Sequence, residues 1–151
     1  MKIARTAFAI TAAAVGVGTG LGGCASTSDV DVDNARVSYA EVRRAIAVAE
    51  REPERLRLID ARLPSDFAAG TLPGAVNMQP VEIRRGAGPD PRLDRFGQKI
   101  VFGENPASPS ARSLVKRMIE EGYDDVAFYA GGWQEWVRLG APAAEPASAS
   151  R

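Results

Sequence analysis

Residues 99–112 read KIVFGENPASPSAR and decide the fold of this chain. The apolar run at 100–102 is typical of a buried strand, and a loop rich in Gly, Pro and Ser follows it. From about Ser110 the apolar residues recur at helical spacing, with Gly122 where a helix C-cap belongs. A strand, a loop and a helix start in this order form a cradle of backbone N–H groups that favours an anion.

The loop of this cradle contains no cysteine. Many enzymes place a nucleophilic cysteine at such a position, because the positive end of the helix lowers the pKa of its thiol. The one cysteine of the chain is Cys24, and the chain has no histidine. The usual general base and the commonest metal ligand are therefore missing. The sequence predicts no catalytic residue, no metal and no cofactor.

Strand and helix patterns alternate on both sides of this stretch. Strands are expected at 36–37, 56–59 and 75–78 and, after the central strand, at 125–129. Helices are expected at 38–50, 65–69, 92–98 and 110–121, and after Gly131. Such βα units indicate an α/β fold with a parallel sheet that is covered by helices on both faces. Ser38 and Glu41 have the spacing of a capping box.

Length and charge limit the functions that are open to the chain. A chain of 151 residues is enough for one domain with a real core. Nineteen basic residues balance nineteen acidic ones, so no basic excess points to nucleic acid. We expect a monomer.

The N-terminal segment has the pattern of an export signal. Lys2 and Arg5 precede fifteen uncharged residues at 6–20, which is too short for a span of ~20 apolar residues. The sequence Leu-Gly-Gly-Cys at 21–24 then resembles the bacterial lipoprotein signal. That resemblance implies a signal peptide at 1–23 and a lipid on Cys24. Because the next residue, Ala25, is not an aspartate, the resemblance also implies an outer-membrane protein that faces the periplasm. The alternative is an ordinary secretory signal.

Two flanking segments carry small and polar residues and are not expected to join the core. Residues 24–35 are interpreted as the lipidated cysteine and a flexible tether, with a reach of roughly 40 Å. Residues 143–151, rich in Ala and Ser, are interpreted as a disordered tail.

Two motifs at a distance from the loop indicate a family. The first runs Asp60-Ala61-Arg62, Phe67, Gly70 and LPGAVN at 72–77, and the second runs GG at 131–132, Trp136, Gly140 and Pro142. With the central strand and Ala-Arg-Ser at 111–113 between them, these residues resemble the rhodanese domain over 36–142. The resemblance implies a single rhodanese-like domain with a five-stranded parallel sheet and helices on both faces. A histidine that is usual in the first motif is replaced by Thr71.

The chain departs from this family at the catalytic position. Alignment from the strand places the nucleophilic cysteine of a sulfurtransferase at Gly103, and alignment from Arg112 places it at Ala107. Neither residue can carry a persulfide, and the lipid would consume the sulfur of Cys24. We therefore expect a catalytically inactive domain on the bacterial cell envelope that binds a partner protein or a small anion. The candidate anion-binding residues are Gly103, Glu104, Asn105, Ala107, Ser108, Ser110, Ala111 and Arg112.

Other functions and roles stay open for the same residues. The chain could be an enzyme in which Ser108 or Ser110 is the nucleophile, Arg112 grips a phosphate-like group, and Asp60 or Glu104 is the base. Ser110 could instead cap the helix, a commoner role for serine. The chain could also be a sulfur-carrier accessory to another sulfurtransferase.

Further roles near the loop are assigned to four residues. The resemblance places Arg112 near Asp60, and these two are interpreted as a partly buried structural pair, grouped with Arg62, that fixes the loop to the strand at 56–59. Trp133, which follows the glycine pair, is the candidate for a partner contact at the mouth of the loop.

Overall fold

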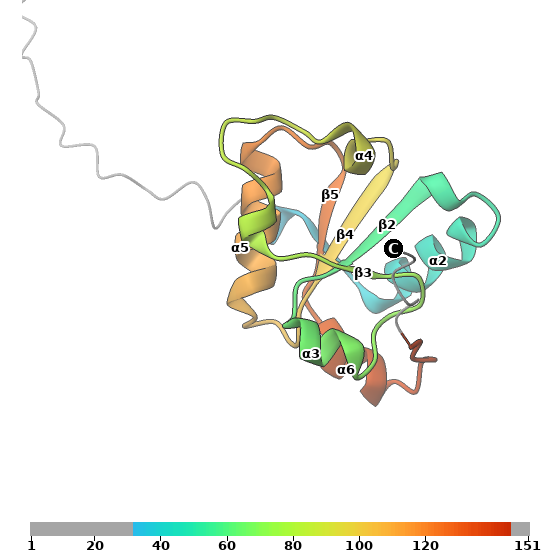
Figure 1. The fold of residues 1–151 in the computed structure, drawn as a ribbon. Coiled ribbons are helices and arrows are strands. Elements are labelled where there is room, and N and C mark those ends of the chain that lie inside the picture. Colours follow the sequence, from blue (N-terminus) through green and yellow to red (C-terminus); the bar gives the residue numbers. More distant parts are fainter. Residues whose placement is uncertain (1–31, 146–151) are drawn as a thin grey trace, which may run out of the picture.

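The computed structural model of the protein describes residues 32–145 and contains one five-stranded sheet (Figure 1). The strand order is β1-β5-β4-β2-β3, and every adjacent pair is parallel. This confirms the predicted α/β class and the parallel sheet. The strands are β1 Arg36–Val37, β2 Leu56–Asp60, β3 Val76–Asn77, β4 Gln98–Phe102 and β5 Val126–Tyr129.

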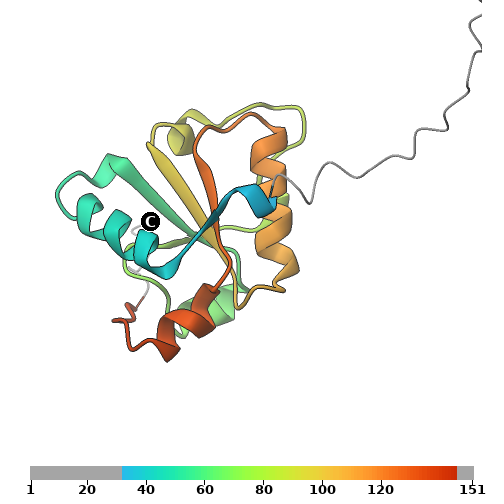
Figure 2. The same ribbon diagram turned by 180° about the vertical axis from the view of Figure 1, so that it is seen from behind.

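Helices cover both faces of the sheet (Figures 1 and 2). Helix α5 lies on one face, and α2 and α6 lie on the other. The predicted capping box begins α2, where the Ser38 N–H donates to Glu41 Oε2 over 2.7 Å. The helices are α2 Tyr39–Ala49, α3 Pro64–Ala68, α4 Pro91–Asp94, α5 Pro109–Glu120 and α6 Gly132–Arg138, with 3-10 turns at Pro53–Arg55 and Pro80–Glu82.

The core consists of two clusters, one on each face of the sheet. Val101 packs with the buried residues of α5, whereas its neighbours Ile100 and Phe102 pack in the cluster that contains Val42 and Trp136. Successive residues of a strand point to opposite faces, so a strand that is covered on both sides needs a continuous apolar run. Because all five strands and both clusters lie within residues 32–145, this segment has a complete core of its own.

The ends of the domain differ from the prediction. Residues 32–34 form a helical turn, and Val32 is 2% exposed in the same cluster as α5 (Figure 2). The tether therefore ends before Val32 and not at residue 35, because the valine is apolar enough to join the core. At the other end, Ala144 and Thr71 exchange two backbone hydrogen bonds of 3.0 Å, so the predicted tail is wrong at its first residues.

Several predictions on the termini lie outside the described residues. These are the signal peptide at 1–23, the lipid on Cys24, most of the tether, and the tail from residue 146 on. Within 32–145, every helix is too short or too polar to cross a bilayer.

Candidate functional site

The carboxyl ends of β2 and β4 meet at one edge of the sheet, and α3 and α6 lie at the same edge (Figure 1). The loop at 103–108 follows β4 there, and the Asp60-Ala61-Arg62 motif follows β2. Ligands of open α/β sheets bind in the crevice outside the carboxyl ends of the strands. This edge is therefore the candidate site.

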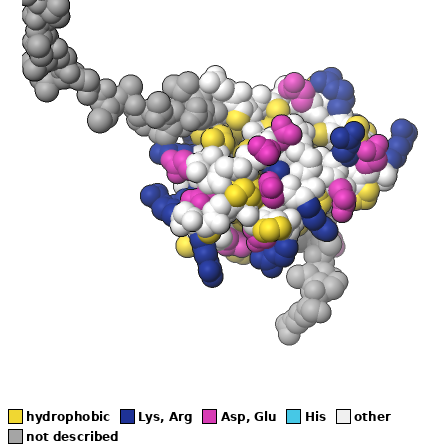
Figure 3. All heavy atoms as spheres, turned by 90° about the horizontal axis from the view of Figure 1, so that it is seen from above, with side chains coloured by type: hydrophobic (Ala, Val, Ile, Leu, Met, Phe, Trp, Pro, Cys, Tyr) yellow, Lys and Arg dark blue, Asp and Glu magenta, His cyan; other side chains and the backbone are white. Residues whose placement is uncertain are grey.

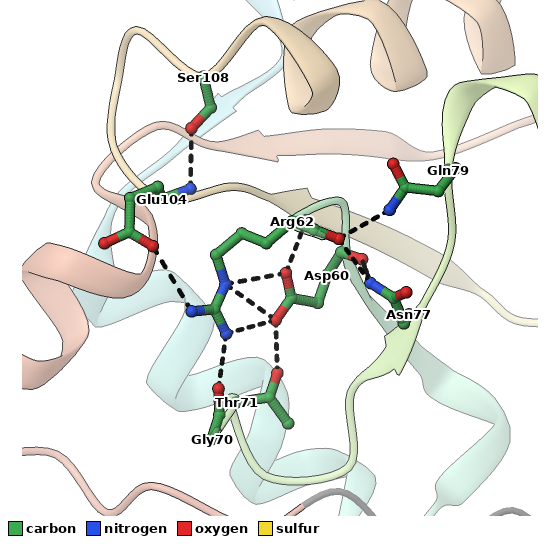
Figure 4. A network of polar contacts seen from close by, with 8 residues as sticks. All are labelled: Asp60, Arg62, Gly70, Thr71, Asn77, Gln79, Glu104 and Ser108. Atoms are coloured by element: carbon green, nitrogen blue, oxygen red, sulfur yellow. Dashed lines mark hydrogen bonds and ion pairs between the residues drawn. The ribbon is translucent and has the colours of Figure 1, made fainter. Parts of the chain in front are cut away.

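The centre of the site is a buried ion pair between Asp60 and Arg62 (Figure 4). Asp60 is fully buried and Arg62 is 6% exposed. Arg62 Nη2 donates to Asp60 Oδ2 over 2.7 Å, Arg62 Nε donates to Oδ1 over 3.1 Å, and the Arg62 backbone N–H donates to Oδ1 over 2.9 Å. The Thr71 hydroxyl adds a fourth donor at 2.8 Å. The Asp60 carboxylate is thus paired with a cation, and both of its oxygens accept hydrogen bonds from protein groups, as a buried charge requires.

Arg62 connects this pair to three other segments of the chain. Its Nη2 donates to the Gly70 carbonyl over 2.6 Å, and its Nη1 lies 3.5 Å from Glu104 Oε2 in the loop. Its guanidinium carbon lies 4.7 Å from the ring centroid of Trp133 in α6, a cation–π contact. Arg62 is therefore tied to three further segments, and four of the five N–H groups of its guanidinium have an acceptor among residues 32–145.

Two amide side chains hold the backbone of the motif from the other side (Figure 4). Asn77 Nδ2 donates to the carbonyls of Asp60 and Arg62 over 2.8 Å each, and Gln79 Nε2 donates to the Arg62 carbonyl over 2.7 Å. Sequence reasoning missed Gln79. The only signal for it is its place two residues after the asparagine of the first motif.

The loop at 103–108 binds its own amides. Ser108 Oγ accepts from the N–H of Glu104 over 2.8 Å and from the N–H of Asn105 over 3.1 Å (Figure 4). Asn105 Oδ1 accepts from the Ala107 N–H over 3.0 Å, and the Asn105 carbonyl accepts from the Ser108 N–H. These four N–H groups were predicted to face an anion, and the loop itself supplies their acceptors.

Gly103 has no room for a side chain. A Cβ built on it would lie 2.5 Å from Ser108 Cβ, 2.6 Å from Ser108 Oγ and 3.0 Å from Ala111 Cβ. Carbon atoms in real structures do not approach so closely. Ser108 thus fills the space directly after β4 in which a larger residue at position 103 would have to sit.

The family model of the rhodanese-like domain matches residues 43–139, which is more than half of the chain. The chain belongs to the rhodanese-like domain family. The match covers both motifs up to Leu139 and the loop between them. The predicted family and the predicted fold are confirmed.

Solved structures of rhodanese-like proteins share this fold. The human single-domain sulfurtransferase is 24% identical, covers 69% of this chain and 96% of its own, and superposes with a TM-score of 0.55. A rhodanese-like domain from Anabaena is 18% identical over 78% of this chain and 88% of its own, with a TM-score of 0.58. A Rhodopseudomonas palustris protein described as a possible tyrosine phosphatase is 16% identical over 78% and 93%, with a TM-score of 0.59. No curated protein sequence matches the chain.

In the structure Asp60 pairs with Arg62 and not with Arg112. Arg112 Nη1 lies 3.3 Å from Asp33 Oδ1; the Arg112 side chain is half-buried and that of Asp33 is exposed. The predicted pairing of Arg112 with Asp60 is wrong, because Arg62 already occupies that carboxylate and the turn at 32–34 brings Asp33 within reach of α5.

The serines of the loop also differ from the prediction. Helix α5 begins at Pro109, so the N-cap position belongs to Ser108 and not to Ser110. The Ser108 hydroxyl serves the loop and does not cap the helix. Asp60 and Glu104, the two candidate bases, bond to other groups, and neither carboxylate accepts from Ser108 or Ser110 in the part of the chain that the structure describes.

Trp133 lies at the loop, as predicted. Its backbone N–H donates to the Gly103 carbonyl over 2.9 Å, and its ring approaches both Arg62 and Gly70. The side chain is half-buried, so one part of the ring supports Arg62 and another part is open to solvent. Clusters of three or more residues that could ligate a metal are absent from residues 32–145.

Replacing Ser108 by alanine will destabilise the domain by about 1–3 kcal/mol, because the Glu104 and Asn105 amides lose their acceptor. Urea unfolding measures the loss, and hydrogen exchange of these two amides will become faster. Ser110→Ala is the matched control, since the Ser110 hydroxyl makes no hydrogen bond among the described residues, and we expect a change below about 0.5 kcal/mol. Equal losses in the two variants would contradict this account of the loop.

Proposed function

We propose that this protein is a catalytically inactive rhodanese-like domain that a lipid on Cys24 holds on the bacterial cell envelope, where it binds a partner protein. The observation that supports inactivity is the packing at Gly103, where Ser108 leaves no space for a nucleophilic side chain. The membership of the family supports the fold and not the activity.

Sulfur transfer needs a thiolate that attacks the donor and then carries the sulfur. The one cysteine of the chain precedes the described domain and lies eight residues before Val32. With its sulfur in a thioether to a lipid, Cys24 has no S–H to ionise, so it can form neither a thiolate nor a persulfide. Under this proposal the chain therefore has no residue that could hold a sulfane sulfur.

A partner protein fits the site better than a small anion does. The N–H groups of Glu104, Asn105, Ala107 and Ser108 already have acceptors, and the Glu104 carboxylate, 42% exposed, adds a negative charge beside them. An anion would have to displace these acceptors and approach that charge. The half-buried ring of Trp133 lies over Arg62, and Leu63, the next residue in the chain, is 63% exposed. An aromatic side chain at the site is the kind of residue that protein interfaces favour.

The absence of sulfur transfer is tested with thiosulfate as donor and cyanide as acceptor. The full chain, extracted from envelopes, is expected to form no thiocyanate above the rate without protein, while an active rhodanese in the same extract buffer does. Thiocyanate formation that is lost in a Cys24→Ser chain would overturn the proposal, because Cys24 would then be a nucleophile and not a lipid carrier.

The lipid anchor is tested separately by mass spectrometry and fractionation. The mature N-terminal peptide is expected to begin at Cys24 and to carry the mass of the acyl chains, and the protein is expected in the membrane fraction. In Cys24→Ser this peptide will be absent. A mature wild-type N-terminus without added mass would contradict the anchor and leave the inactivity of the domain unaffected.

A further inference from the structure

A cleft lies at the opposite edge of the sheet, at the start of β2. Its volume is about 470 Å³, within the range of small-molecule sites. Its wall on one side is helix α2, and on the other it is the segment around Phe96 that leads into β4. The apolar residues that line it include Ile46, Ala49, Leu56, Leu58, Pro73 and Phe96.

Two arginines lie on the same aromatic ring in this cleft. The guanidinium carbon of Arg57 lies 3.9 Å from the ring centroid of Phe96, and that of Arg95 lies 4.8 Å from it. Phe96 is 5% exposed, so the arginines cover a ring that is part of the packed interior. A guanidinium that lies on an aromatic ring keeps its N–H donors in its own plane, where they can bind a carboxylate with two parallel bonds.

The charge of Arg57 is not balanced within the described residues. No carboxylate of residues 32–145 lies within ion-pair distance of it. Burial lowers the pKa of its guanidinium below the ordinary value, and the charge of Arg95 lowers it further. Arg95 has one long contact, 3.8 Å, with Glu54, and both side chains are mostly exposed. An anion bound between Arg57 and Arg95 would therefore be stabilised, because it would compensate two neighbouring positive charges, one of them half-buried.

The rim of the cleft limits how much negative charge a ligand can carry. Glu50 and Glu54 also line it and are exposed, so a ligand with several charges would be repelled. The surface at this end shows acidic, basic and apolar side chains interspersed, without a broad region of one sign (Figure 3). A preference of the cleft for an anionic ligand therefore depends on Arg57 and Arg95 and not on the charge of the surrounding surface.

We propose that this cleft binds a small amphipathic carboxylate, with its chain on the apolar floor and its single charge on Arg57 and Arg95. The apolar floor provides the hydrophobic contact, and the two arginines fix the position of the headgroup. Most residues that line the cleft lie in α2, at the start of β2 or before β4, whereas the loop at 103–108 follows the end of β4 and contributes no lining residue. This inference therefore does not rest on the proposed function.

The test uses three ligands with the same chain and different headgroups: octanoate, octanol and octylamine. Each is titrated, below its aggregation threshold, into the chain from residue 25 on, after a cooperative thermal transition shows that it is folded. We expect octanoate to shift the NMR signals of Phe96 and Ile46 and to bind at least tenfold more tightly than the other two. Octanol binding as tightly as octanoate would overturn the proposal, and so would tighter binding of octylamine, because the glutamates would then decide the sign. The absence of octanoate binding at millimolar concentration would also overturn it.

A matched pair of variants tests the role of the arginines. Arg57→Met keeps an unbranched side chain over Phe96 and removes the charge, and we expect octanoate affinity to fall tenfold or more. Arg43→Met is the control, because Arg43 also lies over an aromatic ring, 5.9 Å from the centroid of Tyr39, and does not line the cleft. If Arg57→Met does not unfold cooperatively, Arg95→Met replaces it, because the Arg95 side chain is more exposed. We again expect a loss of octanoate affinity. Unchanged octanoate affinity in the folded variant would refute the proposal.

Discussion

Replacing Arg62 by methionine will lower the free energy of unfolding by about 3–5 kcal/mol. The substitution leaves the fully buried Asp60 carboxylate with the Thr71 hydroxyl and one backbone N–H as its remaining donors. It also removes the donor to the Gly70 carbonyl and the cation over Trp133. These losses act on one network that joins β2, the segment before β3 and α6.

Thermal and urea unfolding of the chain from residue 25 on measure this effect. For a domain of this size, the expected loss corresponds to a fall in Tm of about 10 °C or more. Arg112→Met is the matched control, because among residues 32–145 the one carboxylate that Arg112 pairs with is the exposed Asp33 and pairs of this kind contribute about 0–1 kcal/mol. Methionine keeps an unbranched side chain beside the Phe128 ring, over which Arg112 lies. Similar losses of unfolding free energy in the two variants would show that the buried pair of Asp60 and Arg62 contributes no more to stability than the pair of Arg112 and Asp33.

Replacing Gly132 by alanine will destabilise the domain by about 3 kcal/mol or more. Gly132 has φ +61°, a left-handed conformation that alone costs roughly 1–2 kcal/mol for an L-residue. A Cβ there would lie 2.5 Å from the Gly103 carbonyl oxygen and 2.9 Å from the carbonyl group of Glu104. Both contacts are with backbone, so no change of rotamer can relieve them, and α6 must move away from the loop.

Gly140→Ala separates the two causes of this loss. Gly140 has φ +68°, close to that of Gly132, and a methyl group on it would have no heavy atom of the described residues within 4 Å. We therefore expect Gly140→Ala to cost only the conformational part, about 1–2 kcal/mol. The additional loss at Gly132 reports the contact of α6 with the loop, where the N–H groups of Trp133 and Gln134 donate to the carbonyls of Gly103 and Glu104. If both variants lose the same free energy, that contact does not constrain the loop.

The elements of the domain could be predicted because their signals are local. The faces of α2 and α5 follow from residues three and four apart, and the capping box at Ser38 spans four residues. Asp60 and Arg62 lie two residues apart, and the family motif identifies them as a unit. The parallel order of the sheet then follows from the alternation of strands and helices.

The contacts that sequence reasoning missed join residues that lie far apart or depend on loop geometry. Arg112 and Asp33 are separated by 79 residues, and Asp33 lies in a segment whose composition indicated a tether. Ser108 was expected in the loop, but periodicity says nothing of where a hydroxyl in a loop points. The hydrogen bonds that close the loop on itself could be found only from its three-dimensional path.

The burial of Val32 has a consequence for where a partner can be met. Only eight peptide units link Cys24 to the first residue of the packed domain, so this linker spans at most about 28 Å when fully drawn out. Under the proposed anchoring, the domain stays within a thin shell next to the lipid headgroups. A partner, whether embedded in the bilayer or freely diffusing, is then bound within reach of that membrane surface.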